Sequence, residues 1–147
     1  MLSRSRNFLS FILLAVLLTA ALPACSTAAQ AGSLHLMSMD KLPAEVQAAP
    51  ASVRTAYQFS AANDEVMKKI PCYCGCGRIG HTSNYSCYVT QADTRGVITY
   101  DDHALGCSIC VDITQDVMRL SRDGKSLPEI RAYVDATYAK YGTSNMP

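Results

Sequence analysis

Hydrophobic residues recur with helical spacing between residues 51 and 70. The positions are Val53, Ala56, Tyr57, Ala61, Val66, Met67 and Ile70. Residues three and four apart share one face of a helix, so this spacing predicts helical structure. The pattern breaks at Asn63, which precedes Asp64 and Glu65, as is typical of the start of a helix. We therefore predict two short helices, the second of which ends before Pro71.

The same periodicity returns in the last third of the chain. The apolar positions are Ile109, Ile113, Val117 and Leu120 in its first part, and Ile130, Tyr133, Val134, Thr137, Tyr138 and Tyr141 in its second. Between the two parts, Gly124 is suited to end one helix. Ser126 and Glu129 form the sequence pattern of a capping box, which starts another helix. A joint this short predicts an antiparallel helical hairpin.

The segment between the helical regions contains two short runs of β-branched and aromatic residues. They are CYVTQ and GVITY, and ADTR separates them, with Gly96 closing the turn. Such runs on either side of a turn predict a small β-hairpin. The predicted fold class is therefore mainly α: a small helical bundle with a C-terminal antiparallel helical hairpin, and with a cysteine-rich loop and a short β-hairpin as an insert.

The first 24 residues have the pattern of a secretory signal peptide. Arg4 and Arg6 precede an apolar run from Phe8 to Ala21, which is shorter than the ~20 residues that a membrane-spanning helix needs. Residues 25–40 are mostly small and polar without periodicity, and we predict a flexible stalk there. Residues 41–147 are long enough for one cysteine-rich domain with a modest core.

The apolar run is followed by LPAC, Leu22 to Cys25, which resembles the lipobox of bacterial lipoproteins. The resemblance implies that Cys25 carries a lipid. It also implies that the domain is anchored to a membrane of the bacterial cell envelope and faces away from the cytoplasm. Pro23 departs from the commonest lipobox pattern, so cleavage nearby by ordinary signal peptidase is the alternative.

Charge and motif content exclude several classes of function. The chain has 13 Lys and Arg against 12 Asp and Glu, without the basic stripe that binds nucleic acid, so we expect no nucleic-acid partner. The sequence contains no Ser-His-Asp set, no phosphate-binding loop and no convincing pair of catalytic carboxylates. The candidate chemistry therefore lies in the cysteines.

Three of these cysteines crowd into the stretch PCYCGCG. They are Cys72, Cys74 and Cys76. A disulfide across a single intervening residue closes a strained ring, so these thiols are poor partners for one another. The two glycines between and after them let the backbone turn tightly enough to bring the three sulfur atoms together. Closely spaced thiolates suit soft ions such as Cu(I) and Zn(II).

A second cluster, Cys107-x-x-Cys110, opens a predicted helix. The two thiols share one helix face near the positive end of the helix dipole, which favours the thiolate. This arrangement serves both redox-active dithiols and metal sites. His81 follows the first cluster and His103 precedes the second, so both are candidate ligands or proton acceptors.

Three hypotheses follow from the cysteines. The first is a soft-metal site for copper, or alternatively zinc, formed by Cys72, Cys74, Cys76, Cys107 and Cys110, with Cys87, His81 and His103 as further candidates. The second is thiol–disulfide exchange, with Cys107 attacking and Cys110 or a loop cysteine resolving the mixed disulfide. The third is a scaffold stapled by three disulfides. We place the metal site first, because exchange needs only two cysteines, and we expect a metal-handling or thiol-redox protein as partner.

The stretches PCYCGCGRIGHTSNYSCYV, CSICVDI and GKSLPEIRAYVDATYAKYG resemble the bacterial lipoproteins named for their PCYCGC motif, also called the CYCXC family. The resemblance runs from about Val53 to Gly142. It implies an exported, lipid-anchored protein. Selenocysteine-containing members of that family would imply redox-active chalcogen chemistry.

Two further resemblances concern parts of the chain. The C-terminal stretch is similar to the membrane-tethered thiol oxidoreductase of cytochrome c maturation, which implies an exchanging dithiol at Cys107 and Cys110. The spacing of Cys72-x-Cys74 and Cys107-x-x-Cys110 resembles the small [2Fe–2S] domains of the bacterioferritin-associated ferredoxin type. We do not expect that cluster, because a loop and hairpin fill the interval here and the N-terminus has no twin-arginine signal for export of a folded cluster.

Overall fold

The structure of the protein is a computed structural model that describes residues 33–146. The predicted signal peptide and the lipidation site at Cys25 lie outside these residues. Within the described range the fold is mainly α, with a two-stranded antiparallel sheet and short 3₁₀ turns. Its helices and strands are α2 (Ala44–Gln47), α3 (Ala51–Ala62), α4 (Asp64–Met67), β1 (Val89–Ala92), β2 (Ile98–Tyr100), α5 (Ser108–Arg122) and α6 (Leu127–Tyr138). None of the helices described is long and apolar enough to cross a membrane.

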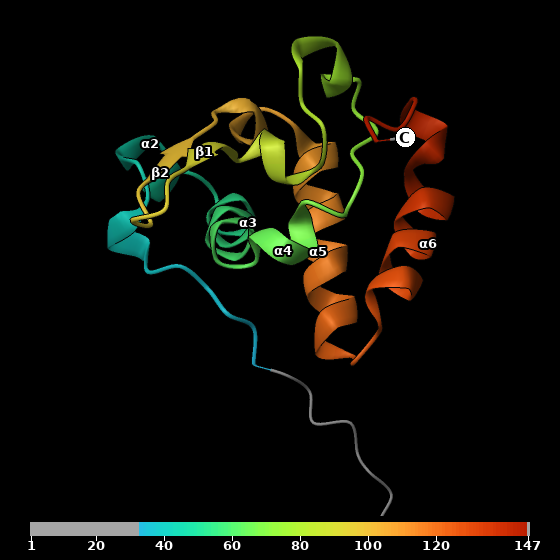
Figure 1. Cartoon of the computed structure of the whole chain (residues 1–147), viewed down its shortest axis with the longest axis horizontal. Coiled ribbons are helices and arrows are strands. Elements are labelled where there is room, and N and C mark those ends of the chain that lie inside the picture. Colours follow the sequence, from blue (N-terminus) through green and yellow to red (C-terminus); the bar gives the residue numbers. More distant parts are fainter. Residues whose placement is uncertain (1–32, 147) are drawn as a thin grey trace, which may run out of the picture.

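Helices α5 and α6 form the predicted antiparallel hairpin and stand side by side in Figure 1. Gly124 turns the chain between them with φ +72°, a conformation that favours glycine. The predicted capping box is confirmed, with the Ser126 N–H donating to Glu129 Oε2 at 2.8 Å. The prediction that Tyr133 and Tyr141 join the buried stripe is wrong. Their exposed fractions are 38% and 54%, and Tyr141 lies past the end of α6, in the 3₁₀ turn Ala139–Tyr141.

Helices α3 and α4 confirm the two helices predicted before Pro71. The buried face of α3, which includes Ala56, Tyr57 and Phe59, packs towards α5. Asn63 occupies the N-cap position of α4, but its side chain makes no capping hydrogen bond. Its amide instead donates to the carbonyl oxygens of His35 and Phe59, both at 2.7 Å. Asn63 therefore holds the N-terminal segment around His35 against the end of α3.

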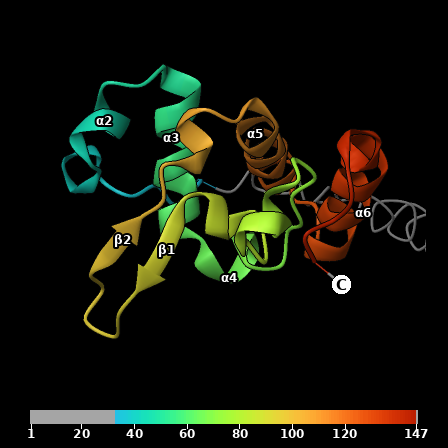
Figure 2. The ribbon, with the colours of Figure 1, turned by 90° about the horizontal axis from the view of Figure 1, so that it is seen from above.

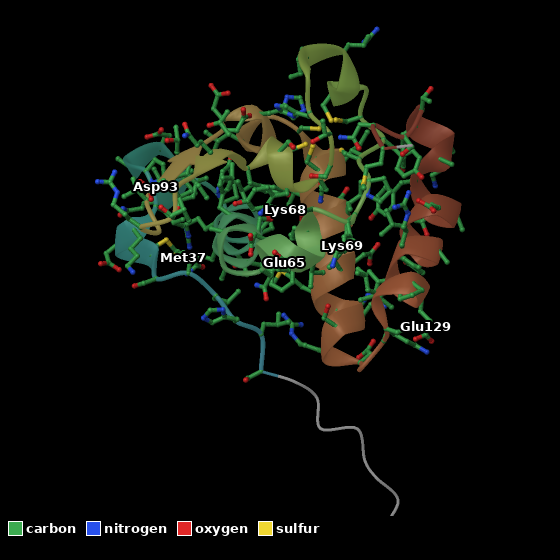
Figure 3. The ribbon with its side chains drawn as sticks, in the orientation of Figure 1. Met37, Glu65, Lys68, Lys69, Asp93 and Glu129 are labelled. Atoms are coloured by element: carbon green, nitrogen blue, oxygen red, sulfur yellow. The ribbon has the colours of Figure 1, made fainter. Side chains whose placement is uncertain are left out.

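That segment already contacts the domain before residue 41. The Met37 N–H donates to the Gln58 carbonyl at 2.9 Å, and the Gln58 amide donates back to the Met37 carbonyl at 2.8 Å. Met37 is labelled on this N-terminal segment in Figure 3. The boundary at residue 41 stays a prediction, while contacts with the domain include Leu34, which packs against the core, and His35.

The predicted β-hairpin is confirmed, and Figure 2 shows it projecting away from the helices. Asp93 shapes its turn, since the Asp93 carboxylate accepts the N–H groups of Arg95 and Val97 at 2.9 Å. At the inner end, the Asp101 N–H donates to the Tyr88 carbonyl at 2.9 Å. The hairpin thereby fixes the return of the chain from the cysteine loop to the start of α5.

The cysteine loop, residues 71–88, lies over the N-terminal end of α5 (Figure 1). Gly75 and Gly80 have φ of +86° and +93°, and these conformations let the loop fold back on itself. In Figure 3 the sulfur atoms gather where the loop meets α5, away from labelled Asp93 and Glu129. Loop folding and the start of α5 therefore bring the two cysteine motifs to one place.

Candidate metal centre

The six cysteines of the described residues are free thiols that lie together. The Sγ atoms of Cys72, Cys74 and Cys110 are 3.4 to 3.6 Å apart in all three pairs. A disulfide would need about 2.05 Å. Two sulfur atoms bound to one tetrahedral ion at about 2.3 Å lie about 3.8 Å apart. The observed separations are therefore close to those of thiolates that share an ion.

A first donor set consists of Cys74, His103, Cys107 and Cys110, whose ligand atoms all lie within 4.8 Å of one another. Three elements supply it. Cys74 comes from the loop, Cys107 and Cys110 from the N-cap and first turn of α5, and His103 from the 3₁₀ turn His103–Leu105. His103 Nε2 is 3.4 Å from Cys74 Sγ. The sequence predicted the cysteines as ligands and His103 as a further candidate, and the structure brings them together.

Cys76 and Cys87 form a second part of the cluster, with their Sγ atoms 3.6 Å apart. Both are buried, at 3% and 0% exposure. Their sulfur atoms lie within 4.8 Å of a ring nitrogen of His81 and of His103. The loop thus sends Cys76 towards Cys87, while Cys74 faces the pair at the start of α5.

Cys72 lies between these two parts and is fully buried. Its Sγ is within 4.8 Å of those of Cys74 and Cys76, and also within 4.8 Å of those of Cys87 and Cys110. The six thiols are therefore continuous, and Cys72 is the thiol common to both parts.

The protonation of the cluster is unequal. Hydrogen bonds with the Cys72 and Cys87 thiols lower the pKa of Cys110 to about 6. Burial, reinforced by the negative charge of Cys110, raises the pKa of Cys74 well above its ordinary value. Hydrogen bonding to Cys110 likewise raises the pKa of Cys87. Without a cation, the thiolate is therefore favoured at Cys110 but not at Cys74 or Cys87, so binding of a metal ion would release further protons.

The two imidazoles stand edge to face, with ring centroids 5.1 Å apart. His81 Nε2 is 3.4 Å from Asp101 Oδ2. Nδ1 of His81 is buried and has no hydrogen-bond partner among the described residues. The backbone N–H of His103 donates to Asp101 Oδ1 at 2.9 Å. One carboxylate thus contacts both histidines.

A polar network holds the first turn of α5 beneath the thiols. The Tyr88 hydroxyl donates to the Cys110 carbonyl at 2.8 Å, and the Thr114 hydroxyl donates to the same carbonyl at 3.1 Å. The Asn84 amide donates to Thr114 Oγ1 at 2.9 Å. All three side chains are fully buried. Sequence reasoning missed this network, because its members are far apart in the chain and no motif links them.

Sequence reasoning also missed Asn145. Its Oδ1 accepts the Cys72 N–H at 2.7 Å, and its backbone N–H donates to the Cys72 carbonyl at 3.1 Å. Its amide nitrogen lies 3.5 Å from Cys76 Sγ and donates to the His81 carbonyl at 3.2 Å. The C-terminal segment therefore covers the cysteine loop from outside.

Two pockets reach the cluster from the surface. One of about 470 Å³ is lined by Cys74, Gly75, Arg78 and residues 141–145. Another of about 310 Å³ is lined by Cys107 and by residues of α3 and α5. The half-buried thiols of the first donor set are thus the ones that face open space.

A family model described as a protein of unknown function with PCYCGC motif matches residues 14–146. The chain belongs to this family. In this PCYCGC-family protein the motif supplies three of the six clustered thiols. No curated protein and no solved structure matches the chain. The lipobox and the similarity to the cytochrome c maturation oxidoreductase stay predictions.

Proposed function

We propose that this protein binds a soft metal ion, with Cu(I) as the first choice and Zn(II) as the second. The observation that carries the proposal is the first donor set, in which three sulfur atoms and one imidazole nitrogen lie within 4.8 Å of one another. Three cysteines and one histidine make a closed tetrahedral site of a kind that holds zinc. Thiolates also select Cu(I) over harder ions.

Copper comes first because the centre is rich in sulfur beyond the needs of one zinc ion. Cys72 lies 3.4 Å from Cys74 and 3.5 Å from Cys110, so a further thiolate adjoins every ligand set. A soft monovalent ion gains from this surplus, whereas one tetrahedral zinc ion is complete with four ligands.

The exposure of the ligands favours exchange of the ion with a partner. Cys74 and Cys107 are half-buried and line pockets, while Cys110 is buried beneath them. We propose a metallochaperone or scavenger that a lipid on Cys25 tethers to a membrane of the bacterial cell envelope. It would face outside the cytoplasm and hand its ion to a metal-handling protein.

Titration of the reduced full chain under anaerobic conditions tests the proposal. Cu(I) is added against a chromophoric Cu(I) chelator, and Zn(II) is titrated in parallel. The unsubstituted chain should bind stoichiometrically, and Cys74→Ser should lose at least tenfold in affinity. Cys25→Ser, which removes a thiol outside the described residues, is the matched control and should bind as the parent does. Protein isolated from its own membrane with three fixed disulfides and no metal would contradict the proposal.

A second candidate function is thiol–disulfide exchange, favoured by the position of Cys107. This half-buried thiol lies at the N-terminus of α5, within 4.8 Å of Cys110, whose pKa is lowered to about 6 by hydrogen bonds with Cys72 and Cys87. The Cys107 thiolate would attack a partner disulfide, form a mixed disulfide and release one partner thiolate. The Cys110 thiolate would then attack Cys107 Sγ and release the second partner thiolate.

That cycle leaves a Cys107–Cys110 disulfide and transfers two electrons to the partner, whose thiolates take up protons. Equilibration with glutathione redox buffers measures the potential of the pair. A reduction potential of roughly −300 mV or lower would place the Cys107–Cys110 pair outside the range of exchanging dithiols and contradict this second function.

A further inference from the structure

We propose that a second soft ion binds to Cys76, Cys87 and His81, so that the centre holds two ions per chain. The inference rests on the proposed function, because it assigns a second ion of the same class to the remaining thiols. The first donor set contains neither Cys76, Cys87 nor His81, so these residues need a role of their own.

The thiol pair has the geometry of two ligands. The Sγ atoms of Cys76 and Cys87 are 3.6 Å apart, close to the about 3.8 Å expected for two sulfur atoms on one tetrahedral ion. They come from separate 3₁₀ turns, Cys76–Ile79 and Tyr85–Cys87. An ion held between them would join the two ends of the loop.

His81 provides the independent observation. The residue is only 9% exposed, yet its Nδ1 has no hydrogen-bond partner among the described residues. A buried polar atom without a partner costs about 1–3 kcal/mol, so natural proteins rarely leave one. One ring nitrogen of His81 lies within 4.8 Å of both sulfur atoms. A metal ion bound by Nδ1 and by the two thiolates would give the unpaired nitrogen a partner.

Asp101 orients this ligand. Its Oδ2 lies 3.4 Å from His81 Nε2, so Nε2 faces the carboxylate and Nδ1 is the ring nitrogen that stays available to a metal ion. The Asp101 backbone is fixed on both sides, since its N–H donates to Tyr88 and its carbonyl accepts the Tyr57 hydroxyl at 2.7 Å. Metal-bound histidines commonly donate their other ring nitrogen to a carboxylate in this way.

Cys72 connects the two sites. Its Sγ lies within 4.8 Å of Cys74 and Cys110 on one side, and of Cys76 and Cys87 on the other. A thiolate has lone pairs for two ions, so Cys72 bridges them. His103 completes the first site, because its Nε2 already lies 3.4 Å from Cys74 Sγ.

Native mass spectrometry of the reduced full chain, loaded anaerobically with Cu(I) alone, counts the ions. We expect two per chain for the parent and one per chain for His81→Asn. His35→Asn, which changes an exposed histidine on the N-terminal segment, is the matched control and should keep two. One ion in the parent overturns the second site and leaves the proposed function standing. No ion in the parent overturns both, and two ions in folded His81→Asn overturn the assignment of His81.

If His81→Asn fails to fold, Asp101→Asn tests whether His81 is a ligand of the second ion. It keeps every ligand and an oxygen to accept the His103 N–H, but removes the carboxylate that faces His81. We expect the affinity for one of the two ions to fall by about 10–100-fold while the other is unchanged. Equal affinities in Asp101→Asn and the parent would overturn the role of His81 as a ligand held by Asp101.

Discussion

The side-chain oxygen of Asn145 accepts the backbone N–H of Cys72 at 2.7 Å, although 73 positions separate the two residues. The backbone N–H of Asn145 also donates a hydrogen bond to the Cys72 carbonyl at 3.1 Å. One residue of the C-terminal segment thus forms hydrogen bonds with both backbone groups of Cys72. The segment is a structural part of the centre, although it supplies no ligand.

Asn145→Ala should destabilise the fold by about 1–3 kcal/mol, because the part-buried Cys72 N–H loses its acceptor. Urea unfolding of the metal-free, reduced chain measures the change. Thr143→Ala, at an exposed position two residues away, is the matched control and should stay within about 0.5 kcal/mol of the parent. Equal effects of the two substitutions would show that Asn145 does not hold the loop.

Gly142→Ala should also loosen this segment. A Cβ atom at Gly142 would lie 2.7 Å from the Tyr73 carbonyl oxygen, so one backbone segment must move, at a cost of about 1–3 kcal/mol. Gly106→Ala is the control, because nothing lies within 4 Å of its Cβ position. Thermal unfolding should separate the two variants, and a Gly142→Ala protein as stable as Gly106→Ala would argue against the close contact.

The capping box of α6 should make stability depend on acid. Hydrogen bonds from the Ser126 hydroxyl and N–H lower the pKa of Glu129 from 4.5 to about 2. A depressed pKa in the folded state adds stability above the unfolded pKa, and that stability is lost as pH falls from 4.5 to about 2.

Thermal midpoints of the parent and Glu129→Gln, measured across that pH window, test this expectation. The parent should be the more stable at the upper end, and the difference should shrink towards the lower end. Glu45→Gln, in an exposed position of α2, is the matched control. A difference between parent and Glu129→Gln that does not change with pH would exclude the carboxylate as its source.

Metal loading should stabilise the folded chain, because the ligands come together only in the native state. A ligand at 100 times its Kd adds about 2.7 kcal/mol to the free energy of unfolding. Differential scanning fluorimetry with and without Cu(I) measures this effect, and a chelator should reverse it. Cys74→Ser should show a smaller shift than Cys25→Ser, and an identical shift in both would place the ion elsewhere.

Lipidation at Cys25 predicts a simple localisation result. In a bacterium given labelled palmitate, the parent should carry label and sediment with membranes. Cys25→Ala should carry none, because the thiol that receives the lipid is gone. Cys74→Ser, which leaves the LPAC sequence intact, is the control and should be labelled. A parent without label would favour cleavage by ordinary signal peptidase, and label that persists in Cys25→Ala would show that the lipid is not on Cys25.

Local sequence patterns were sufficient to predict helices α3 to α6 and the β-hairpin, but not the short helix α2. Apolar spacing and the Ser126–Glu129 pair are short-range signals. The helices α5 and α6 and the turn between them could therefore be predicted from the local sequence alone. Tyr133 and Tyr141 show the limit of that method, since periodicity gives a helix face but not whether another element covers it. Asn63 shows another limit, because a residue suited to capping found acceptors on His35 and Phe59 instead.

The candidate centre was predictable in composition but not in arrangement. Cysteine spacing identified the thiols, and their closeness to His81 and His103 raised the two histidines as candidates. That Cys76 meets Cys87, while Cys74 meets His103 and Cys110, depends on the left-handed glycines that fold the loop. The roles of Asn145 and Asp101 arise from tertiary contacts alone, which no local pattern encodes.

The contact between Asn145 and Cys72 has a consequence for biosynthesis. Residues 142–145 follow all six clustered cysteines in the sequence, and a chain is made from its N-terminus. During synthesis, the thiols therefore emerge before the segment that covers them. Until residues 142–145 have been made, the centre is open on this side, and metal binding and oxidation compete for its thiols.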